Sequence, residues 1–234
     1  MTNHELRITN HKFPIGSAQW KYLIIEGAKT FDVCPDQEKT GQFAIHGLEL
    51  LKWNRKMNLT AITDPLEVAV KHFLDSIAPA PVIPPSSSLL DIGSGGGFPG
   101  IPLKILIPSL SVTLIDTSRK KVSFQKHIIR TLKLGNIKAR HIRAEDLARE
   151  KPFAKAFDVI ICRALSSLDA FVAMARPLLA EHGMMIALKG KVSEAEIESW
   201  ENLKTGKDGF SLVLKKYKLP YLGAERAIIC LKRP

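Results

Sequence analysis

The sequence predicts an α/β fold: a mostly parallel sheet with an antiparallel C-terminal hairpin and a helical N-terminal extension. Three observations support this prediction. Short apolar runs alternate regularly with helical stretches over 88–203. The first of these runs leads directly into a glycine-rich loop. The last two apolar runs, at 210–218 and 225–232, follow each other with no helix between them.

The alternating region defines the sheet. Strands are expected at 88–93, 112–116, 137–143, 157–163 and 184–189. Helices are expected between them at 101–107, 119–134, 167–180 and 193–203. This regular order is typical of a parallel sheet covered by helices on both faces. The two closing runs are joined through Pro220 and Gly223, so we expect them to pair as a hairpin at the sheet edge.

A proline-rich segment at 78–88 separates this region from the residues before it. Proline lacks a backbone N–H, so the segment should be neither helix nor central strand. Before it, apolar residues recur at helical spacing over 36–56, and Asp64-Pro65 has the form of a helix start. We expect three parts: an N-terminal extension (1–35), partly mobile and with a short helix at 20–29, a helical region (36–85), and a core (86–234).

The chain is strongly basic. It has 234 residues, of which 34 are Lys or Arg and 23 are Asp or Glu, so its formal net charge is +11. An isoelectric point near 9.6 predicts attraction to polyanions. The basic residues are spread along the chain, which favours a broad phosphate-contacting face over a basic tail.

Composition disfavours several functional classes. No apolar run reaches the ~20 residues of a membrane helix, and the N-terminus lacks the layout of a signal peptide, so we expect a cytoplasmic protein. Cys34, Cys162 and Cys230 are widely spaced and form no C-x-x-C motif. We therefore expect neither a disulfide framework nor a bound metal.

The loop after the first strand carries the main functional signal. Glycines allow a sharp turn and close approach to a ligand, and this loop lies at the usual ligand crevice of such sheets. Two cofactors fit different registers of it. Gly95-x-Gly97-x-x-Gly100 matches the dinucleotide fingerprint, whereas Asp91-x-Gly93-x-Gly95-x-Gly97 is the pattern of S-adenosylmethionine (SAM) methyltransferases.

The register favours SAM over NAD. The strand ends near Ile92, so Gly93 is the turn glycine, and the third dinucleotide glycine would then fall at Phe98. In the later register, Pro99 and Pro102 crowd the start of the helix. Because SAM has no pyrophosphate, it needs no helix N-terminus dedicated to phosphate.

Further candidates stand where later strands end. Asp116 ends the second strand, where its carboxylate can accept hydrogen bonds from ribose hydroxyls or cap the next helix. Ala144 and Glu145 follow the third strand, where a loop contacting adenine is expected. Arg163 and Lys189 end the fourth and fifth strands, at the ligand-binding edge of the sheet.

Several motifs together resemble the bacterial RsmG family, also called glucose-inhibited division protein B. In chain order they span Asn58–Ile62, Lys71–Ser76, Leu90–Pro102, Asp116–Lys121, Arg143–Glu145, Cys162–Ala164 and Ala187–Gly190. Members of this family are SAM-dependent methyltransferases that act on guanine N7 in small-subunit (16S) ribosomal RNA. The resemblance covers 40–232 and implies a Rossmann-like class I SAM methyltransferase fold; residues 1–35 look like an addition.

The resemblance also implies residue roles. Gly93 and Phe98 would line the SAM site, Ala144 and Glu145 would flank the adenine, and Arg163 would lie at the reactive end. The full predicted cofactor set is Asp91, Gly93, Gly95, Gly97, Phe98, Asp116, Ala144, Glu145 and Arg163. The candidate RNA contacts are Lys71, His72, Arg119 and Lys189. Phe98 can press on cofactor or base, or pack in the core.

Guanine N7 chemistry needs no general base. N7 has a free lone pair at neutral pH, so the enzyme supplies in-line positioning rather than proton removal. Arg163 can bond guanine O6 bidentately, and we assign it an orienting role because contact with N7 itself would block the nucleophile. Cys162 precedes Arg163 rather than a proline, which disfavours cytosine C5 methylation. Cys162-Arg163-Ala164-Leu165 also replaces the Asn/Asp-Pro-Pro-aromatic motif of exocyclic-amine methylation.

Three alternatives stay open. A SAM methyltransferase for a small metabolite would show no salt-sensitive RNA binding. A non-catalytic ribosome-binding factor would keep the fold without turnover. An NAD-dependent oxidoreductase would bind NADH. The predicted partner is 16S ribosomal RNA or the small ribosomal subunit, with no membrane, no metal and a monomeric state.

Overall fold

The computed structural model describes residues 13–163, 167–197, 200 and 210–233. Its strands are β1 (Ser88–Ile92), β2 (Ser111–Asp116), β3 (Ile137–His141), β4 (Phe157–Arg163), β5 (Leu179–Lys189), β6 (Ser211–Lys218) and β7 (Glu225–Lys232). Its main helices are α1 (Ala18–Ala28), α2 (Gln37–Met57), α5 (Gly100–Leu106), α6 (Arg119–Thr131), α7 (Ala144–Arg149) and α8 (Leu168–Ala175). A further helix runs from α3 (Pro65–Glu67) through a π-helical turn (Val68–Leu74) into α4 (Asp75–Ile77).

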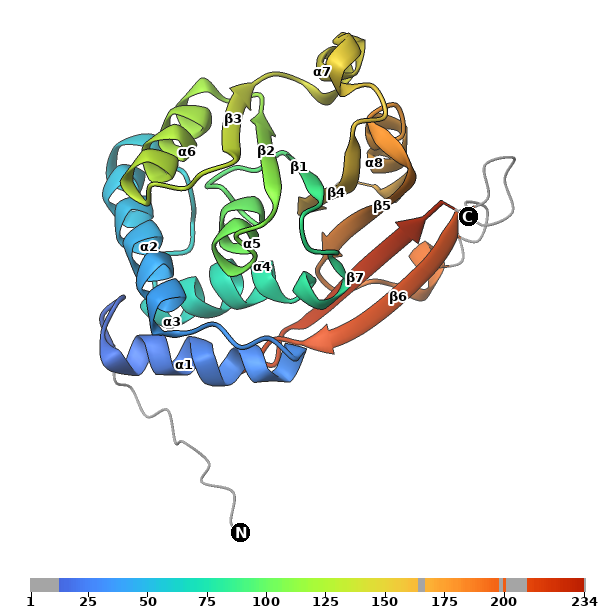
Figure 1. The fold of residues 1–234 in the computed structure, drawn as a ribbon. Coiled ribbons are helices and arrows are strands. Elements are labelled where there is room, and N and C mark those ends of the chain that lie inside the picture. Colours follow the sequence, from blue (N-terminus) through green and yellow to red (C-terminus); the bar gives the residue numbers. More distant parts are fainter. Residues whose placement is uncertain (1–12, 164–166, 198–199, 201–209, 234) are drawn as a thin grey trace.

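The described strands form one sheet in the order β3-β2-β1-β4-β5-β7-β6 (Figure 1). Strands β1 to β5 pair in parallel. Strand β7 runs antiparallel between β5 and β6. The predicted fold is therefore confirmed, including the C-terminal hairpin. The carboxyl ends of the parallel strands meet at one edge, which is where ligands bind in such sheets.

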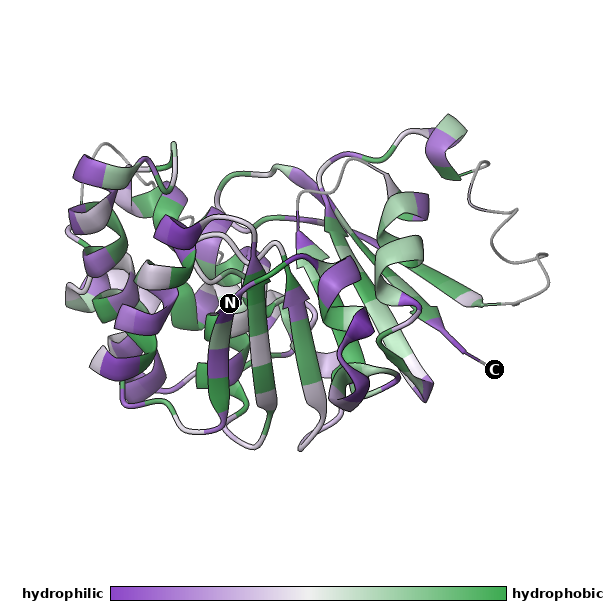
Figure 2. Ribbon diagram, turned by 90° about the horizontal axis from the view of Figure 1, so that it is seen from above, coloured by the Kyte–Doolittle hydropathy of each residue, from purple (hydrophilic) through white to green (hydrophobic). Residues whose placement is uncertain are grey.

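Two hydrophobic clusters lie on opposite faces of the sheet. One contains side chains of α1, α2, α5 and α6, including the fully buried Phe43 and Phe124. The other contains side chains of α7 and α8, including the fully buried Leu147 and Phe171. Viewed from above, the strands stand between the two groups of helices (Figure 2). The sheet is thus covered on both faces, as the uninterrupted apolar runs predict.

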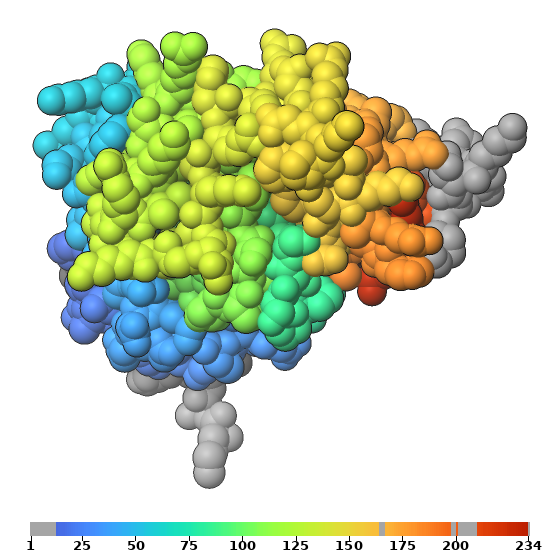
Figure 3. All heavy atoms as spheres, turned by 45° about the horizontal axis from the view of Figure 1, so that its top comes forward, coloured from blue at the N-terminus to red at the C-terminus, as the bar shows by residue number. Residues whose placement is uncertain are grey.

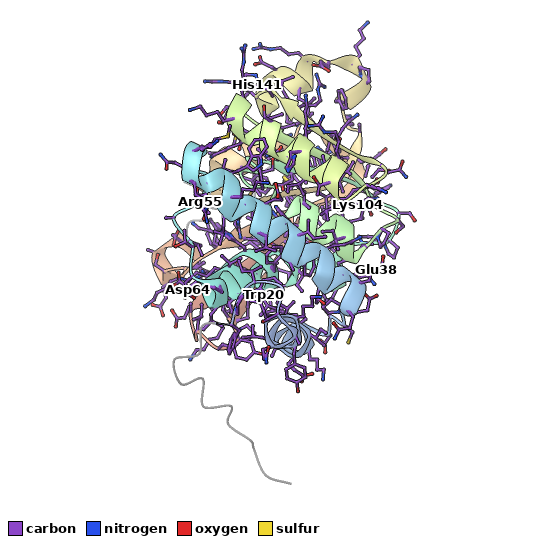
Figure 4. The ribbon with its side chains drawn as sticks, turned by 90° about the vertical axis from the view of Figure 1, so that its left-hand side faces the viewer. Trp20, Glu38, Arg55, Asp64, Lys104 and His141 are labelled. Carbon is purple, nitrogen blue, oxygen red and sulfur yellow. The ribbon has the colours of Figure 1, made fainter. Side chains whose placement is uncertain are left out.

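The N-terminal helices pack against the helices that cover one face of the sheet, because α2 contacts α5 and α6, and α1 contacts α2. Helix α2 crosses this face between α6 and α1 (Figure 4). The Trp20 side chain is fully buried, and its indole N–H donates to the Pro65 carbonyl oxygen at 2.9 Å. Asp64 caps the helix at Pro65 by accepting from two backbone N–H groups, as the sequence predicts. Residues from α1 to β5 share one core, so these helices are part of the scaffold of the site.

Three sequence predictions of local structure were wrong. The predicted helix at 167–180 ends at Ala175, and β5 begins at Leu179 rather than at 184. Pro177 explains the early end, because it has no backbone N–H and the helical hydrogen bonds stop at Arg176, whose N–H donates to the Val172 carbonyl oxygen. A loop was predicted at Ala144, but this residue is the first of α7. The proline-rich segment was predicted to contain no helix, but it includes a short 3₁₀ turn (Ala80–Val82). Residues 1–12 and much of the predicted helix at 193–203 lie outside the described residues.

Candidate active site

The glycine loop turns sharply out of β1 and presents an open side. Gly93 has φ +71°, and a Cβ added there would meet no atom within 4 Å. Gly97 has φ +88°, and its Cβ would lie 2.4 Å from Ile101 Cδ1 of α5. Left-handed backbone favours glycine. Gly97 therefore lets α5 pack closely, whereas Gly93 leaves space for a ligand.

Side chains from two distant helices hold this loop. Gln125 of α6 is fully buried, and its amide donates to Ser94 Oγ and to the Gly95 carbonyl oxygen, both at 2.8 Å. His46 of α2 is also fully buried, with Nε2 at 2.8 Å from the Gly96 carbonyl oxygen. Sequence reasoning missed both residues. Their signal was a polar side chain placed on the apolar face of a helix.

Replacing Gln125 should loosen the loop. In Gln125→Leu, the Gly95 carbonyl oxygen and Ser94 Oγ lose a buried donor, which costs about 1–3 kcal/mol of stability. We expect a lower melting temperature and weaker SAM binding, measured by thermal unfolding and calorimetry. Unchanged values for both would show that the loop keeps its shape without this residue.

A cavity of about 370 Å³ opens beside the loop. It lies between the ends of β1 and β2 and the start of α7, and α6 and α7 appear on this face in Figure 3. Four predicted cofactor residues line it: Gly93, Asp116, Ala144 and Glu145. Other lining residues that the sequence did not indicate include Lys121, Met174 and Ile142. The structure thus brings together predicted residues from three separate segments, namely the glycine loop, the end of β2 and the start of α7.

Asp116 anchors the floor of this cavity. Its carboxylate accepts from the Gly95 N–H at 2.9 Å and from the Ser118 N–H at 2.8 Å, and the residue is 7% exposed. A carboxylate has about four lone-pair sites, so these bonds leave about two for a ligand. A pair of ribose hydroxyls requires two acceptor sites. The geometry of Asp116 therefore fits ribose binding, whereas its bond to the N–H of Ser118, the N-cap residue of α6, leaves the N–H groups of the first helical turn uncapped by Asp116.

Asp91 lies behind the loop rather than in the cavity. It is fully buried, and its Oδ2 accepts from the Gly100 N–H at 2.8 Å, at the start of α5. Burial raises the pKa of Asp91 to about 7, against the lowering effects of that N–H and of Arg163. Its Oδ1 has no hydrogen-bond partner among the described residues. Asp91 thus contacts the loop and α5 and does not line the cavity.

Arg163 lies where β4 reaches the carboxyl edge. Its Nη1 donates to the Lys71 carbonyl oxygen at 2.9 Å and lies 3.9 Å from Asp75 Oδ2. The guanidinium also sits 5.3 Å from the centre of the Phe98 ring, and the side chain is 21% exposed. Burial lowers the pKa of Arg163, and the carboxylates of Asp75 and Asp91 oppose that shift. Arg163 is therefore held on one side and accessible on another.

Phe98 and His72 form a buried aromatic stack. The Phe98 ring lies between His46 and His72, with ring centroids 4.6 and 4.5 Å away. Phe98 is 3% exposed and His72 is 6% exposed. His72 Nε2 lies 3.0 Å from Thr60 Oγ1. Both predicted residues thus pack beneath the loop and do not line the cavity beside Gly93.

This stack predicts acid sensitivity. Burial is the main cause that lowers the pKa of His72 to about 3 and of His46 to about 4. Unfolded histidine takes up a proton near pH 6.5, so the contribution of these two histidines to the free energy of unfolding should fall as pH drops from about 6.5 to about 4. In His72→Phe this loss should be smaller. Denaturant titrations of both proteins at pH 7 and pH 5 measure it, and an equal loss in both would contradict the assignment to His72.

The other predicted RNA contacts differ in accessibility. Arg119 is exposed at the start of α6. Lys71 pairs with Glu67 one helical turn away. Lys189 pairs with Glu196 and lies 5.5 Å from the centre of the Trp200 ring. The described residues contain no cluster of three or more metal-ligating side chains, and no helix among them is long and apolar enough to span a membrane.

The glycine loop, the Asp116 cavity and the strand order can be compared with known proteins. The family model described as rRNA small subunit methyltransferase G matches residues 40–225. The chain belongs to this family. It is 40% identical over 213 residues to ribosomal RNA small subunit methyltransferase G of Geotalea uraniireducens (strain Rf4), covering 91% of this chain and 96% of that protein. The counterpart from Geobacter metallireducens (strain ATCC 53774 / DSM 7210 / GS-15) is 42% identical over 214 residues, with 91% and 96% covered.

A solved structure supports the fold independently. TYW2 of M. jannaschii, determined in complex with AdoMet, has a TM-score of 0.51 and 17% sequence identity, covering 68% of this chain and 77% of that one. Membership of the small subunit methyltransferase G family and this fold confirm the predicted class I methyltransferase architecture and SAM as the cofactor. The residues present fit SAM, because Gly93 leaves open space beside the Asp116 carboxylate.

Proposed function

We propose that this protein methylates N7 of a specific guanine in 16S ribosomal RNA, by in-line displacement without a general base. The observation that carries the proposal is the cavity that joins Gly93, Asp116, Ala144 and Glu145 in a chain whose relatives are named for small subunit rRNA methylation. The net charge of +11 supports a polyanionic substrate.

The cavity residues hold the cofactor. Asp116 would accept hydrogen bonds from the ribose, and Ala144 and Glu145 at the start of α7 would border the adenine. Met174 and Ile142 give that end of the cavity apolar walls suited to a base. When bound, SAM would supply a methyl group on a positively charged sulfur. The N7 lone pair can attack the methyl carbon and displace the sulfur, and N7 need not lose a proton first.

The histidines and the cysteine near the loop support a mechanism without a base. His46 and His72 are buried and held neutral by low pKa values, and neither lines the cavity. Cys162 is fully buried, and burial raises the pKa of its thiol, which disfavours a thiolate nucleophile. The remaining task of the protein is to position the guanine N7 in line with the methyl group, which is what N7 alkylation requires.

Arg163 is the group we assign to orient the substrate. One of the five N–H donors of Arg163 bonds to the Lys71 carbonyl oxygen. The Arg163 side chain keeps some exposure at the sheet edge. A guanidinium held in this way can bond a guanine O6 or the SAM carboxylate. It approaches the edge of the base without removing a proton.

Transfer of label from SAM tests the proposal. Small ribosomal subunits from a strain lacking this enzyme, and RNA extracted from them, are each incubated with protein and methyl-labelled SAM. Incorporation into either is expected. Subunit binding without incorporation would favour a non-catalytic ribosome-binding factor. Bound SAM with neither binding nor incorporation would favour a small-molecule substrate. A cytoplasmic location and a monomeric state remain predictions.

A further inference from the structure

A basic groove lies at the carboxyl edge of the sheet, on the far side of Arg163 from the cofactor cavity. It has a volume of about 450 Å³ and lies between the end of β5 and the C-terminal hairpin. Its charged lining residues are Lys191, Lys216, Lys218, Arg226, Glu194 and Glu225. None of them belongs to the site described above.

Strand pairing places this groove at the ligand-binding edge. Arg163 of β4 pairs with Leu188 of β5, and Lys189 pairs with Ala227 of β7. Lys218 at the end of β6 pairs with Glu225 at the start of β7. The ends of β4, β5 and β6 and the start of β7 therefore lie together at the carboxyl edge of the sheet. They belong to the half of the sheet that contains the C-terminal hairpin (Figure 1).

A buried carboxylate connects the groove to Arg163. Asp75 is 4% exposed, and its Oδ1 accepts from the Tyr217 hydroxyl at 2.8 Å and lies 3.5 Å from Arg226 Nε. Its Oδ2 lies 3.9 Å from Arg163 Nη1. Tyr217 and Arg226 also line the groove. Arg163 and two residues of the groove wall thus contact the same carboxylate. Lys216 and Lys218 alternate with Tyr217 along β6, so they point to the other face of the sheet at the same edge.

The charges of the groove suit a chain of phosphates. Lys216 and Lys218 are exposed and lie on the same side of β6. The rise of a strand separates two such residues by about 7 Å. Such a pair can contact successive phosphates of an extended single strand. Lys191 lies 3.9 Å from Glu225, but their side chains are 83% and 56% exposed. An ion pair so open to solvent contributes little, so a phosphate can displace Glu225 from it.

We propose that this groove binds the phosphate backbone of the RNA segment next to the target nucleotide. The inference rests on the proposed function for the identity of the RNA. It assigns the C-terminal hairpin to substrate binding and leaves cofactor binding to the cavity at Asp116. Phosphate contacts fix the register of the RNA without reading its sequence.

Paired charge reversals test the groove. Lys216→Glu/Lys218→Glu is compared with Lys151→Glu/Lys155→Glu, which makes the same charge change at exposed lysines before β4, at the opposite edge of the sheet. Binding to unmodified 16S ribosomal RNA, made by transcription, is measured over a range of salt concentrations. Loss of two phosphate contacts should reduce the slope of log K against log salt by about 1.4–1.8 in the groove variant.

Controls separate binding from folding and from catalysis. SAM affinity and melting temperature should match the wild type in both variants, and Lys216→Gln/Lys218→Gln serves if the glutamates prevent folding. Edge-strand lysines can also act only to prevent aggregation. Equal salt slopes in groove and control variants, with or without aggregation, would overturn the proposal.

The outcome for the groove is distinct from that for the proposed function. If the wild type methylates 16S RNA and both double variants bind RNA equally, the proposed RNA-binding groove is overturned and the proposed function is supported. If the wild type methylates no RNA, but the slope of log K against log salt is reduced only in the groove variant, the groove is supported as an RNA-binding site and the proposed function is overturned. A wild type that binds no RNA overturns the groove.

Discussion

Asp116→Ala should weaken SAM binding by about 10- to 100-fold, the equivalent of about 1.4–2.8 kcal/mol. A hydrogen bond to a charged acceptor contributes about this much. The substitution removes the sites available to the ribose and also the acceptor that holds the Gly95 N–H. Isothermal calorimetry with purified protein measures the change directly.

Asp158→Ala provides a matched control. Asp158 of β4 accepts from the Ser88 N–H at 2.8 Å and from its hydroxyl at 2.7 Å, near the opposite edge of the sheet. Its loss should lower stability and leave SAM affinity unchanged. Equal SAM affinity in Asp116→Ala and the wild type would show that the cofactor does not bind in this cavity.

Arg163→Ala should lower kcat for methyl transfer by about 100-fold and leave the protein folded. Misplacement of a reacting group by a small distance costs about this much. The fold should persist because Asp75 keeps Tyr217 and Arg226 as partners. Single-turnover rates with saturating RNA and SAM measure the effect, and circular dichroism checks the fold.

Arg163→Lys and Arg140→Ala complete this test. Lysine keeps the charge but lacks the planar donors, so Arg163→Lys should stay slow if orientation is the role. Arg140 pairs with Glu150 through two hydrogen bonds and does not line the cofactor cavity, so Arg140→Ala should transfer methyl groups at the wild-type rate. Wild-type turnover in Arg163→Ala would remove this residue from the site.

The sheet and the cofactor cavity were largely predictable because their signals are local. Each parallel strand is a short apolar run, and the residues that follow it in sequence come together at one edge. Gly93 and Asp116 are 23 residues apart, yet strand pairing brings Ile92 opposite Ile115 and both residues into one cavity. That rule needs only strand order and direction.

Side-chain burial was less predictable because it depends on contacts between distant segments. His72 carries a polar group, but it is buried by Phe98, which comes 26 residues later. Lys189 ends a strand as expected, yet its ammonium group pairs with Glu196. Gln125 and His46 hold the glycine loop from other helices. No local pattern specifies which helix lies over the loop.

The site of methylation tests the central claim most directly. After transfer from labelled SAM, the RNA is digested to nucleosides, and the labelled position is located in the intact sequence. We expect 7-methylguanosine as the only labelled nucleoside, at one position of 16S ribosomal RNA. Label on an exocyclic amine, on cytosine C5 or on a ribose would contradict it, because those reactions require removal of a proton, whereas alkylation of N7 does not.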